Sequence, residues 1–291
     1  MKTLSDYKGH LPSSEEPVDD ERQRIEIELL LEGIYRLYGN DFRDYAYDSI
    51  CRRITHFVKQ QGLPSITALL ERVLHDPKMI EPLLRSLTIN VTEMFRTPSL
   101  FLYFRNKVVP FLHTYPSIRI WHAGCSTGEE VLSMAILLRE EGLYEKARLY
   151  ATDIDQVALE QAQSGKVLLS SMQQYTHNYI ASGGKGSFSD YYTVDAQDKV
   201  TFNSSLLKHV LFAKHNLVTD QSFNEFHVIF CRNVMIYFNR NLQKRVHRLF
   251  YESLSRFGML VLGERETIRF SGFEACYDTV SSEEKVYQKI K

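Results

Sequence analysis

The sequence is poor in the features that mark a metal centre, a disulfide framework or a membrane protein. It has four cysteines in 291 residues, far apart and without a CxxC pair, so neither a zinc site nor a disulfide framework is indicated. No apolar run is long enough to span a membrane, and the polar first residues lack the apolar core of a signal peptide. We therefore expect a protein of the reducing cytoplasm that binds no metal and does not insert into a membrane.

The sequence also lacks an excess of charge of either sign. Its 35 Lys and Arg residues against 36 Asp and Glu residues give a formal net charge of −1. Electrostatic recognition must therefore come from a local patch, and nucleic acid is disfavoured as a partner. With 44% hydrophobic and 24% charged residues the chain has the composition of an ordinary globular protein. Nothing indicates an obligate assembly, so we expect a monomer.

The first part of the chain is helical in pattern. Residues 1–21 are rich in charge, Pro and Ser and are predicted to be disordered. Between residues 22 and 87, four short stretches carry apolar residues at helical spacing, without a strand pattern. This predicts a small all-α domain. Residues 88–117 are interpreted as a linker followed by an amphipathic helix over 101–112.

From residue 118 onward, strands and helices alternate. Strand patterns begin at Ile118 and recur at 147–152, 226–231, 258–262, 273–276 and 286–290. The alternation breaks at about 166–212, where short strands at 199–202 and 210–213 predict a small antiparallel β-subdomain. The order of elements predicts an α/β fold with a doubly wound, mostly parallel sheet that has an antiparallel edge strand.

A loop of small residues at 123–128 joins the first strand of this region to its helix. Such a strand–loop–helix unit opens nucleotide-binding α/β folds, because its backbone can approach a ligand closely. It is not a phosphate loop, since no lysine follows Gly128. Glu129 and Glu130 stand in the first helical turn, where they disfavour an anionic ligand and suit one that carries an amino group. S-adenosylmethionine fits this pattern better than a dinucleotide.

Two acidic residues follow the second strand of this region. Asp153 lies a little over twenty residues beyond the loop, the spacing at which an acidic residue accepts hydrogen bonds from both ribose hydroxyls of a nucleoside. Its alternative role is a helix cap. Because Asp155 begins the next helix, we assign the cap to Asp155 and the ribose to Asp153.

Polar residues also follow two later strands. Arg232 and Asn233 come directly after the apolar strand at 226–231, where they could meet a ligand, although Arg232 could instead form a buried ion pair. After the strand at 210–213, the backbone near Leu217 and the side chain of Asn216 could meet an adenine edge. A simple strand-end turn is the equal alternative.

Two further segments carry candidate residues. The linker holds Asn90, Thr92 and Arg96, which could hold a ligand at the mouth of the cleft or could serve as caps and a hinge. The second predicted helix is basic. A charge run on a helix is usually a solvated face, but this one could dock an acidic partner helix. Its cations are Arg43, Arg52, Arg53, His56 and Lys59.

Six motifs follow one another as they do in one known family. TINVTEMFR, AGCSTGEE, ATDID, HNLV, FCRNVMIYF and GERE occur in this order, and the chain resembles the CheR-type chemoreceptor glutamate methyltransferases over roughly residues 24–290. The resemblance implies a four-helix N-terminal domain and a class I methyltransferase domain, which would occupy residues 118–291 with a β-subdomain inserted. It also implies S-adenosylmethionine as the cofactor and acidic helices of chemoreceptor cytoplasmic domains as the partner.

The resemblance also implies roles for particular residues. Glu129 would face the amino group of the cofactor and Asp153 its ribose, while Arg96 and Tyr237 would flank the methyl group and orient the incoming carboxylate. Arg52 and Arg53 would contact the acidic receptor helices. The full set of cofactor contacts carried over by motif is Asn90, Thr92, Arg96, Glu129, Asp153, Asn216, Leu217, Arg232 and Asn233.

The implied chemistry makes modest demands on the enzyme. A glutamate side chain is ionised at neutral pH, so no general base is required. Catalysis is then expected from proximity, orientation and desolvation of the carboxylate, with neither Arg96 nor Tyr237 acting as an acid or base. The alternatives are a methyltransferase for a small molecule or nucleic acid, and a cofactor-binding docking module without turnover, because the fold alone does not decide chemistry.

The sequence departs from the family pattern in two places. Relatives commonly show a histidine and a serine between the glycine and the last glutamate of the segment that here reads Gly263 to Glu266, and we assign that segment no catalytic role. Residues 178–198 do not match the subdomain with which some relatives grip a receptor's C-terminal pentapeptide. We therefore expect an enzyme that acts without this tether.

Overall fold

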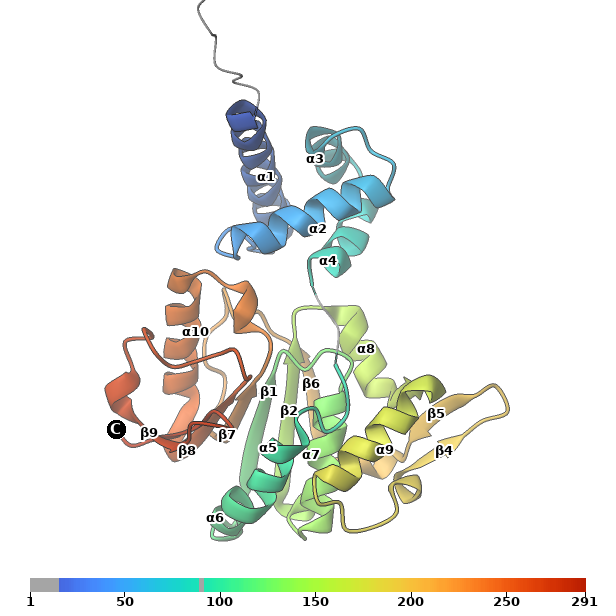
Figure 1. Ribbon diagram of the computed structural model, residues 1–291, viewed down its shortest axis with the longest axis vertical. Helices are drawn as coiled ribbons and strands as arrows, with labels where there is room; N and C mark the ends of the chain where they lie inside the picture. Colours follow the sequence, from blue (N-terminus) through green and yellow to red (C-terminus); the bar gives the residue numbers. More distant parts are fainter. Residues whose placement is uncertain (1–15, 89–91) are drawn as a thin grey trace, which may run out of the picture. The chain divides into compact units, whose positions relative to one another are not determined.

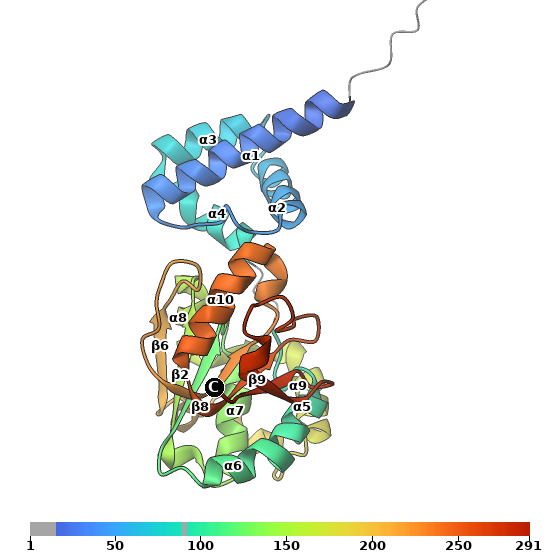
Figure 2. The same cartoon turned by 90° about the vertical axis from the view of Figure 1, so that its left-hand side faces the viewer.

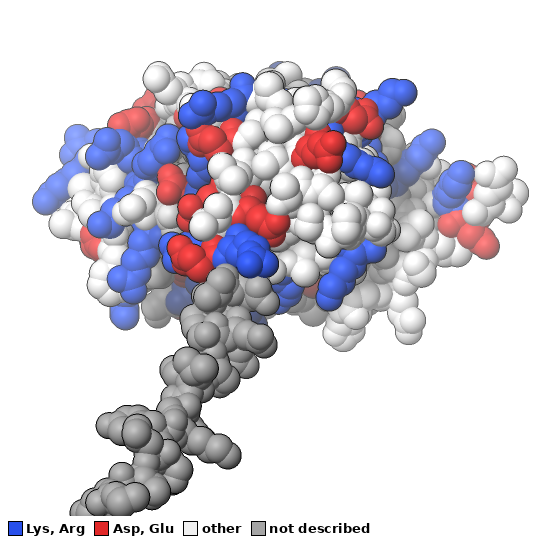
Figure 3. All heavy atoms as spheres, turned by 90° about the horizontal axis from the view of Figure 1, so that it is seen from above, with Lys and Arg blue, Asp and Glu red and all other residues white. Residues whose placement is uncertain are grey.

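The computed structural model describes residues 16–88 and 92–291, and these residues form two compact units. One unit runs up to residue 43 and continues from 47 to 87, and the other combines residues 44–46 with the chain from 88 to the end. Acidic and basic side chains are interspersed over the face drawn in Figure 3, in keeping with a net charge of −1. No helix of the described residues has the length and apolarity needed to cross a bilayer.

The first unit consists of helices, as predicted (Figure 1). They are α1 (Glu16–Tyr38), α2 (Tyr47–Gln60), α3 (Ile66–His75) and α4 (Ile80–Leu87), the last preceded by a 3₁₀ turn, Pro77–Met79. Ser65 caps α3, since its side chain accepts a hydrogen bond from the Ala68 N–H at 3.1 Å. The prediction of disorder up to residue 21 is wrong for residues 16–21, which belong to α1, and its remainder lies outside the described residues.

The second unit contains a seven-stranded sheet. Its strands are β1 (Ile118–Ala123), β2 (Ala147–Asp153), β6 (Val210–Lys214), β7 (Phe226–Cys231), β8 (Leu254–Leu262), β9 (Tyr277–Ser281) and β10 (Val286–Lys289). Their order is β6-β2-β1-β7-β8-β10-β9, and β10 pairs antiparallel with both of its neighbours while the other pairs are parallel. The predicted mostly parallel sheet with an antiparallel edge is confirmed.

Two details of the predicted strands are wrong. Residues 210–214 do not belong to the inserted subdomain, because β6 pairs in parallel with β2 and forms the edge of the main sheet. Residues 273–276 are not a strand either. Glu274–Cys276 form a 3₁₀ turn, and the edge strand β9 follows it.

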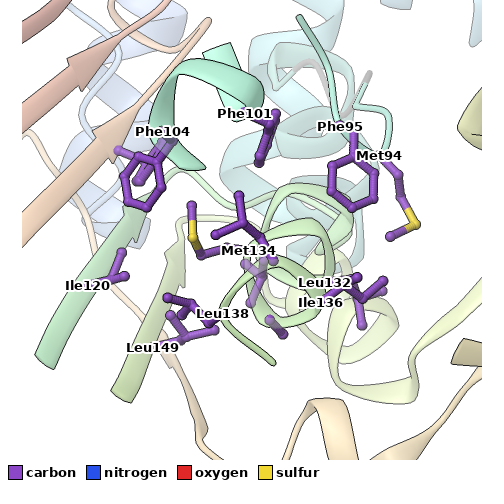
Figure 4. Packing of buried hydrophobic residues seen from close by; sticks show 14 of the residues in the cluster. Met94, Phe95, Phe101, Phe104, Ile120, Leu132, Met134, Ile136, Leu138 and Leu149 are labelled. Carbon is purple, nitrogen blue, oxygen red and sulfur yellow. The ribbon is translucent and has the colours of Figure 1, made fainter. Parts of the chain in front are cut away.

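Helices cover both faces of the sheet (Figures 1 and 2). Side chains alternate along β7, so that Val228 and Phe230 face one apolar core and Ile229 and Cys231 face the other. The first core is closed by α7 (Glu129–Glu140) and by the helical run α5 (Pro98–Tyr103), a π turn (Phe104–Val108) and α6 (Val109–His113) (Figure 4). The second core is closed by α10 (Arg240–Ser253). The doubly wound architecture is thus confirmed.

A small subdomain follows α8 (Gln156–Ser164). Its strands β3 (Lys166–Leu168), β4 (Tyr192–Val194) and β5 (Lys199–Phe202) form an antiparallel sheet in the order β3-β5-β4. The helix α9 (Met172–Ala181) lies in the chain between β3 and β4 and was not foreseen, because the sequence there lacks clear periodicity.

Arg105 ties this subdomain to α7. Its buried guanidinium donates to Glu140 at 2.5 Å and to Glu141 at 2.8 Å, and its Nε donates to the carbonyl of Ser182 just after α9. Tyr179 of α9 donates its hydroxyl to the same Glu140. The ion pair therefore joins three elements that are distant in the sequence.

Replacing Arg105 by alanine should lower the free energy of unfolding by about 3–5 kcal/mol, because the buried carboxylate of Glu140 would lose its cation, whereas Glu141 would keep its ion pair with Lys185. Urea unfolding followed by circular dichroism measures this change. As a control, Glu225→Gln breaks an ion pair at 3.7 Å in which the Glu225 side chain is 62% exposed, and it should cost less than about 1 kcal/mol. Equal effects of the two variants would contradict the assignment.

Candidate functional site

The candidate site lies at the carboxyl ends of β2, β1 and β7, which are adjacent and parallel. Ala123 is in register with Thr152, and His122 with Phe230, so the loops that follow these strands meet at one edge of the sheet. The Gly124 and Cys125 N–H groups donate to the Thr152 carbonyl at 2.8 and 2.9 Å. The three loops that the sequence singled out are therefore neighbours, as ligand sites in such sheets require.

Two glycines let these loops pack against their neighbours. Gly124 has φ 79°, and a Cβ there would lie 2.4 Å from the Val234 side chain. Gly128 has φ 93°, and a Cβ there would lie 2.8 Å from Cβ of Ala162 on α8. At both positions the space left by the missing side chain is filled by the protein itself, so these glycines shape the site rather than merely opening it to a ligand.

Asp153 is held in place at the end of β2. Its side chain accepts hydrogen bonds from the Ser126 N–H at 2.7 Å and from the Asp155 N–H at 3.0 Å, and the residue is only 8% exposed. Burial raises the pKa of its carboxyl group. Asp155 caps α8 by accepting from the Val157 and Ala158 N–H groups, as predicted. Asp153 does not cap the helix, and its carboxylate keeps lone pairs that can accept hydrogen bonds from further donors.

Glu129, the first residue of α7, is a second buried carboxylate. It is 5% exposed and accepts a hydrogen bond from the Thr127 hydroxyl at 2.7 Å. Burial raises the pKa of its carboxyl group. No ion pair among the described residues involves Glu129 or Asp153. A ligand that brings an ammonium group and hydroxyls to these two carboxylates would compensate for their burial.

Glu130, by contrast, has its partners within the protein. Its carboxylate contacts His122 Nδ1 at 2.8 Å and the Arg232 guanidinium at 3.1 Å. Burial alone would raise its pKa, but the hydrogen bond with His122 and the charge of Arg232 outweigh burial and lower it. Glu130 is therefore not available to an amino-bearing ligand in the way that the sequence suggested.

Arg232 forms a buried ion pair, which was the alternative to a ligand contact. Besides Glu130, it donates to the Arg96 carbonyl at 3.0 Å and to the Thr97 hydroxyl at 2.9 Å, and its side chain is 5% exposed. Among the described residues its buried Nε–H has no hydrogen-bond partner. The prediction that Arg232 contacts a cofactor therefore rests on this one N–H, while the rest of the guanidinium holds the backbone beside Arg96.

The backbone on both sides of Arg96 is strained and fixed. Phe95 has φ 50° and Thr97 φ 62°, left-handed values that non-glycine residues rarely adopt. The Phe95 N–H donates to the Ser133 hydroxyl on α7 at 2.8 Å. The Asn178 side chain on α9 donates to the carbonyl of Met94 at 3.0 Å. Strain of this kind persists where the surroundings impose it, and it is typical of functional sites.

Glu266 is a residue of the site that the sequence did not reveal. Its carboxylate, 5% exposed, accepts from the N–H groups of Gly263 at 2.6 Å and Asn233 at 3.0 Å. It also accepts from Val234 at 2.9 Å and Met235 at 2.8 Å. Glu266 thus clamps the turn after β7, in which Asn233 has the left-handed φ of 61°.

Tyr237 lies at the end of this turn, in the 3₁₀ segment Met235–Tyr237, and is half-buried. Its carbonyl accepts from the Ala46 N–H at 2.8 Å, and the next residue, Phe238, packs edge to face on Tyr45. Residues 44–46 therefore brace the backbone of Tyr237 within the second unit.

The segment after β6 forms the strand-end turn that was the alternative to adenine binding. The Asn216 side chain accepts from the Val218 N–H at 2.9 Å, and the Asn216 N–H donates to Asp220 at 2.9 Å. Leu217 is buried in the second apolar core. A contact with a nucleobase would thus fall mainly to the backbone here, and it stays a prediction for both residues.

The remaining candidates differ in outcome. Thr92 is half-buried, and Asn90 lies outside the described residues. In the first unit, Arg53 is buried and donates to the Leu87 carbonyl, so its predicted role as an exposed docking residue is wrong. Arg52 and His56 lie on the solvent side of α2, where the docking prediction stands untested.

A pocket of about 200 Å³ adjoins Arg232. It is lined by Thr97, Ser99, Leu100, Arg232, Leu262, Glu264, Glu283, Glu284 and Lys285. This lining holds three carboxylates against two cations, Arg232 and Lys285, so we do not place an anionic substrate there. Within the described residues no group of three or more His, Cys, Asp or Glu could hold a metal ion.

Comparison with known proteins agrees with this geometry. Residues 90–286 match the family described as CheR methyltransferase, SAM binding domain, and residues 25–88 match its all-alpha domain. The Pseudomonas putida protein Cher3 is 50% identical over 91% of this chain and 97% of its own length. Chemotaxis protein methyltransferases of Borreliella burgdorferi and Escherichia coli are each 30% identical, covering 84% and 80% of this chain and 88% and 81% of their own.

Proposed function

Because the chain belongs to the CheR methyltransferase family, we propose that it transfers the methyl group of S-adenosylmethionine to glutamate side chains of chemoreceptor proteins. The product is a glutamate methyl ester. Acidic helices of the receptors' cytoplasmic domains are the proposed partner, and the exposed basic side of α2, with Arg52, is one proposed contact. The enzyme is proposed to act without a C-terminal receptor tether.

Three groups of the site fit the cofactor. The buried carboxylates of Glu129 and Asp153 are suited to the amino group and to the ribose hydroxyls, because no cation of the described residues forms an ion pair with them. The orphan Nε–H of Arg232 is suited to a carboxylate. When bound, the cofactor supplies an electrophilic methyl group on a sulfonium.

The observation that carries the proposal is the fixation of Arg96. Arg232, Ser133 and Asn178 hold the strained backbone around it at the same sheet edge as Asp153. A guanidinium carried by this fixed backbone can orient a substrate carboxylate, and the Tyr237 hydroxyl can donate to it. Since a glutamate is already ionised at neutral pH, orientation and desolvation are what the protein must provide.

Incubation with methyl-labelled cofactor and membranes that contain candidate receptors tests the proposal. Base-labile label on the receptor protein is the expected result. Label on a small molecule or nucleic acid would favour another methyltransferase. Cofactor binding without transfer would favour a docking module that lacks turnover.

As the pH is lowered, cofactor binding should begin to weaken at a higher pH than it would if the carboxyl groups of the site had ordinary pKa values. The ionised form of Glu129 attracts the amino group, and burial raises the pKa of Glu129 above 4.5 and that of Asp153 above 3.8. The Kd of S-adenosylhomocysteine should therefore rise as the pH falls through these raised values. Calorimetric titrations at a series of pH values from neutral downward measure this, and Glu129→Gln should show weaker binding with a shallower pH dependence. Parallel curves for the two proteins would refute the role of Glu129.

A further inference from the structure

The solvent face of α10 carries three cations that form no ion pair within the part of the chain that the structure describes. Arg240, Lys244 and Arg248 are exposed, and their spacing of four residues places them along one stripe of the helix. No ion pair among the described residues involves any of them. Arg245 is exposed beside them, but its guanidinium donates a hydrogen bond to the Val218 carbonyl at 2.6 Å.

This arrangement is unfavourable for the helix itself. Like charges four residues apart repel each other, and a cation at the first residue of a helix opposes the helix dipole. The first turn of α10 has no acidic residue to offset Arg240. On α1, in contrast, Arg24 and Arg36 each pair with a glutamate four residues away. A face that breaks these local rules without an ion pair to offset the repulsion is a candidate for binding.

An exposed aromatic side chain adjoins the stripe. Phe270 is 74% exposed and has a left-handed φ of 65°, a conformation that is costly for a residue with a Cβ. The Arg240 guanidinium lies 5.9 Å from the centre of its ring. Arginine beside an exposed aromatic ring is the composition of binding hot spots. We call Arg240, Lys244, Arg248 and Phe270 the α10 surface.

The α10 surface begins next to the proposed catalytic apparatus. Asn239 caps α10 two residues after Tyr237, so Arg240 stands three residues beyond that tyrosine. From there the stripe extends over two turns, about 12 Å along the helix. A partner bound along it would have one end close to the segment of Tyr237.

We propose that the α10 surface docks an acidic helical segment of the methyl-accepting protein, next to the glutamate that is methylated. This inference rests on the proposed function and adds a docking surface within the methyltransferase unit itself. A helix with carboxylates at a spacing of three or four residues would place them opposite the three cations, and an apolar side chain of that helix could cover Phe270. Charge complementarity of this kind mainly accelerates encounter, and salt weakens it.

Charge reversal of Lys244 and Arg248 to glutamate tests the proposal. For this variant, kcat/KM for receptor-containing membranes should fall about 10-fold or more at low salt, and the loss should shrink as salt is raised. kcat at saturating receptor and the Kd of the cofactor should be unchanged. The matched control is the reversal of the exposed Lys107 and Lys208 of the same unit, for which a change of less than about twofold is expected.

A binding measurement separates this proposal from the proposed function. Fluorescence anisotropy with a labelled acidic helical peptide from a receptor's methylated region should show weaker binding to the α10 variant and unchanged binding to the control. Such a result would support docking even if the wild-type protein transferred no methyl group. Equal binding of the peptide to all three proteins would overturn the proposal. The proposal would also be overturned if the α10 variant lost binding only to anionic vesicles or to duplex nucleic acid and kept its binding to the peptide.

Discussion

Replacing Arg96 by alanine is expected to lower methyl transfer by about 10³-fold or more while the fold persists. Arg96 is the cation proposed to hold the substrate carboxylate in line with the methyl group, and removing such a group costs orientation as well as charge stabilisation. The fold should tolerate the change, because Arg232 binds the backbone carbonyl of Arg96, which alanine retains. Single-turnover rates at saturating cofactor, with thermal unfolding measured in parallel, provide the test.

Two further variants sharpen the test of Arg96. Arg96→Lys keeps the charge but loses the planar fork, so it should restore only part of the rate. Arg265→Ala removes an exposed arginine to which no role is assigned, and it should leave the rate unchanged. Full turnover by the Arg96→Ala protein would refute the role of Arg96 in orienting the substrate.

Replacing Glu266 by alanine is expected to damage both stability and activity. The N–H groups of Gly263, Asn233, Val234 and Met235 would lose their acceptor. Each buried donor left unpaired costs about 1–3 kcal/mol, so we expect the free energy of unfolding to fall by at least about 3 kcal/mol. The turn that leads to Tyr237 would lose its clamp, and the transfer rate should fall by about 100-fold or more even where the protein is folded.

Glu264→Ala is the matched control, since Glu264 is exposed in the same segment. Its stability and rate should equal those of the wild type. Glu266→Gln should be intermediate at best, because its amide nitrogen would face N–H donors in place of an oxygen. If Glu266→Ala behaved like Glu264→Ala in urea unfolding and in transfer assays, Glu266 would not be a positioning residue.

The fold was predictable because its signals are local. Apolar runs and helical spacing located the strands and helices, and the position of Asp155 directly before a helix distinguished the cap from Asp153. The edge strand β6 was misplaced for a physical reason. Its sequence forms a strand, but pairing with β2 depends on residues more than fifty positions away.

The burial of Arg53 follows from the helical spacing of α2. At helical spacing Arg53 shares a face with Ile50, Ile54 and Phe57, all of which are buried. Only Arg52 turns to solvent, although the two arginines are neighbours in the sequence. A basic run on a helix must therefore be divided into faces before it is interpreted as a surface.

The parts of the site that the sequence could not reveal depend on long-range contacts. Arg232 pairs with Glu130, which is 102 residues away, and nothing near either residue indicates the other. Glu266 binds backbone N–H groups about thirty residues away, and backbone groups have no sequence signature. The sequence thus identified residues suited to ligand contact, whereas the residues that hold them in place required the structure.

The most direct test is to map the methylated residues on a receptor after incubation with the protein and S-adenosylmethionine. Mass spectrometry of receptor peptides should find methyl esters on glutamates of acidic cytoplasmic helices, removed by mild base and absent with the Arg96→Ala protein. Methyl groups on other residue types, or no receptor modification by a folded, cofactor-binding protein, would contradict the assignment of this chain as a receptor glutamate methyltransferase.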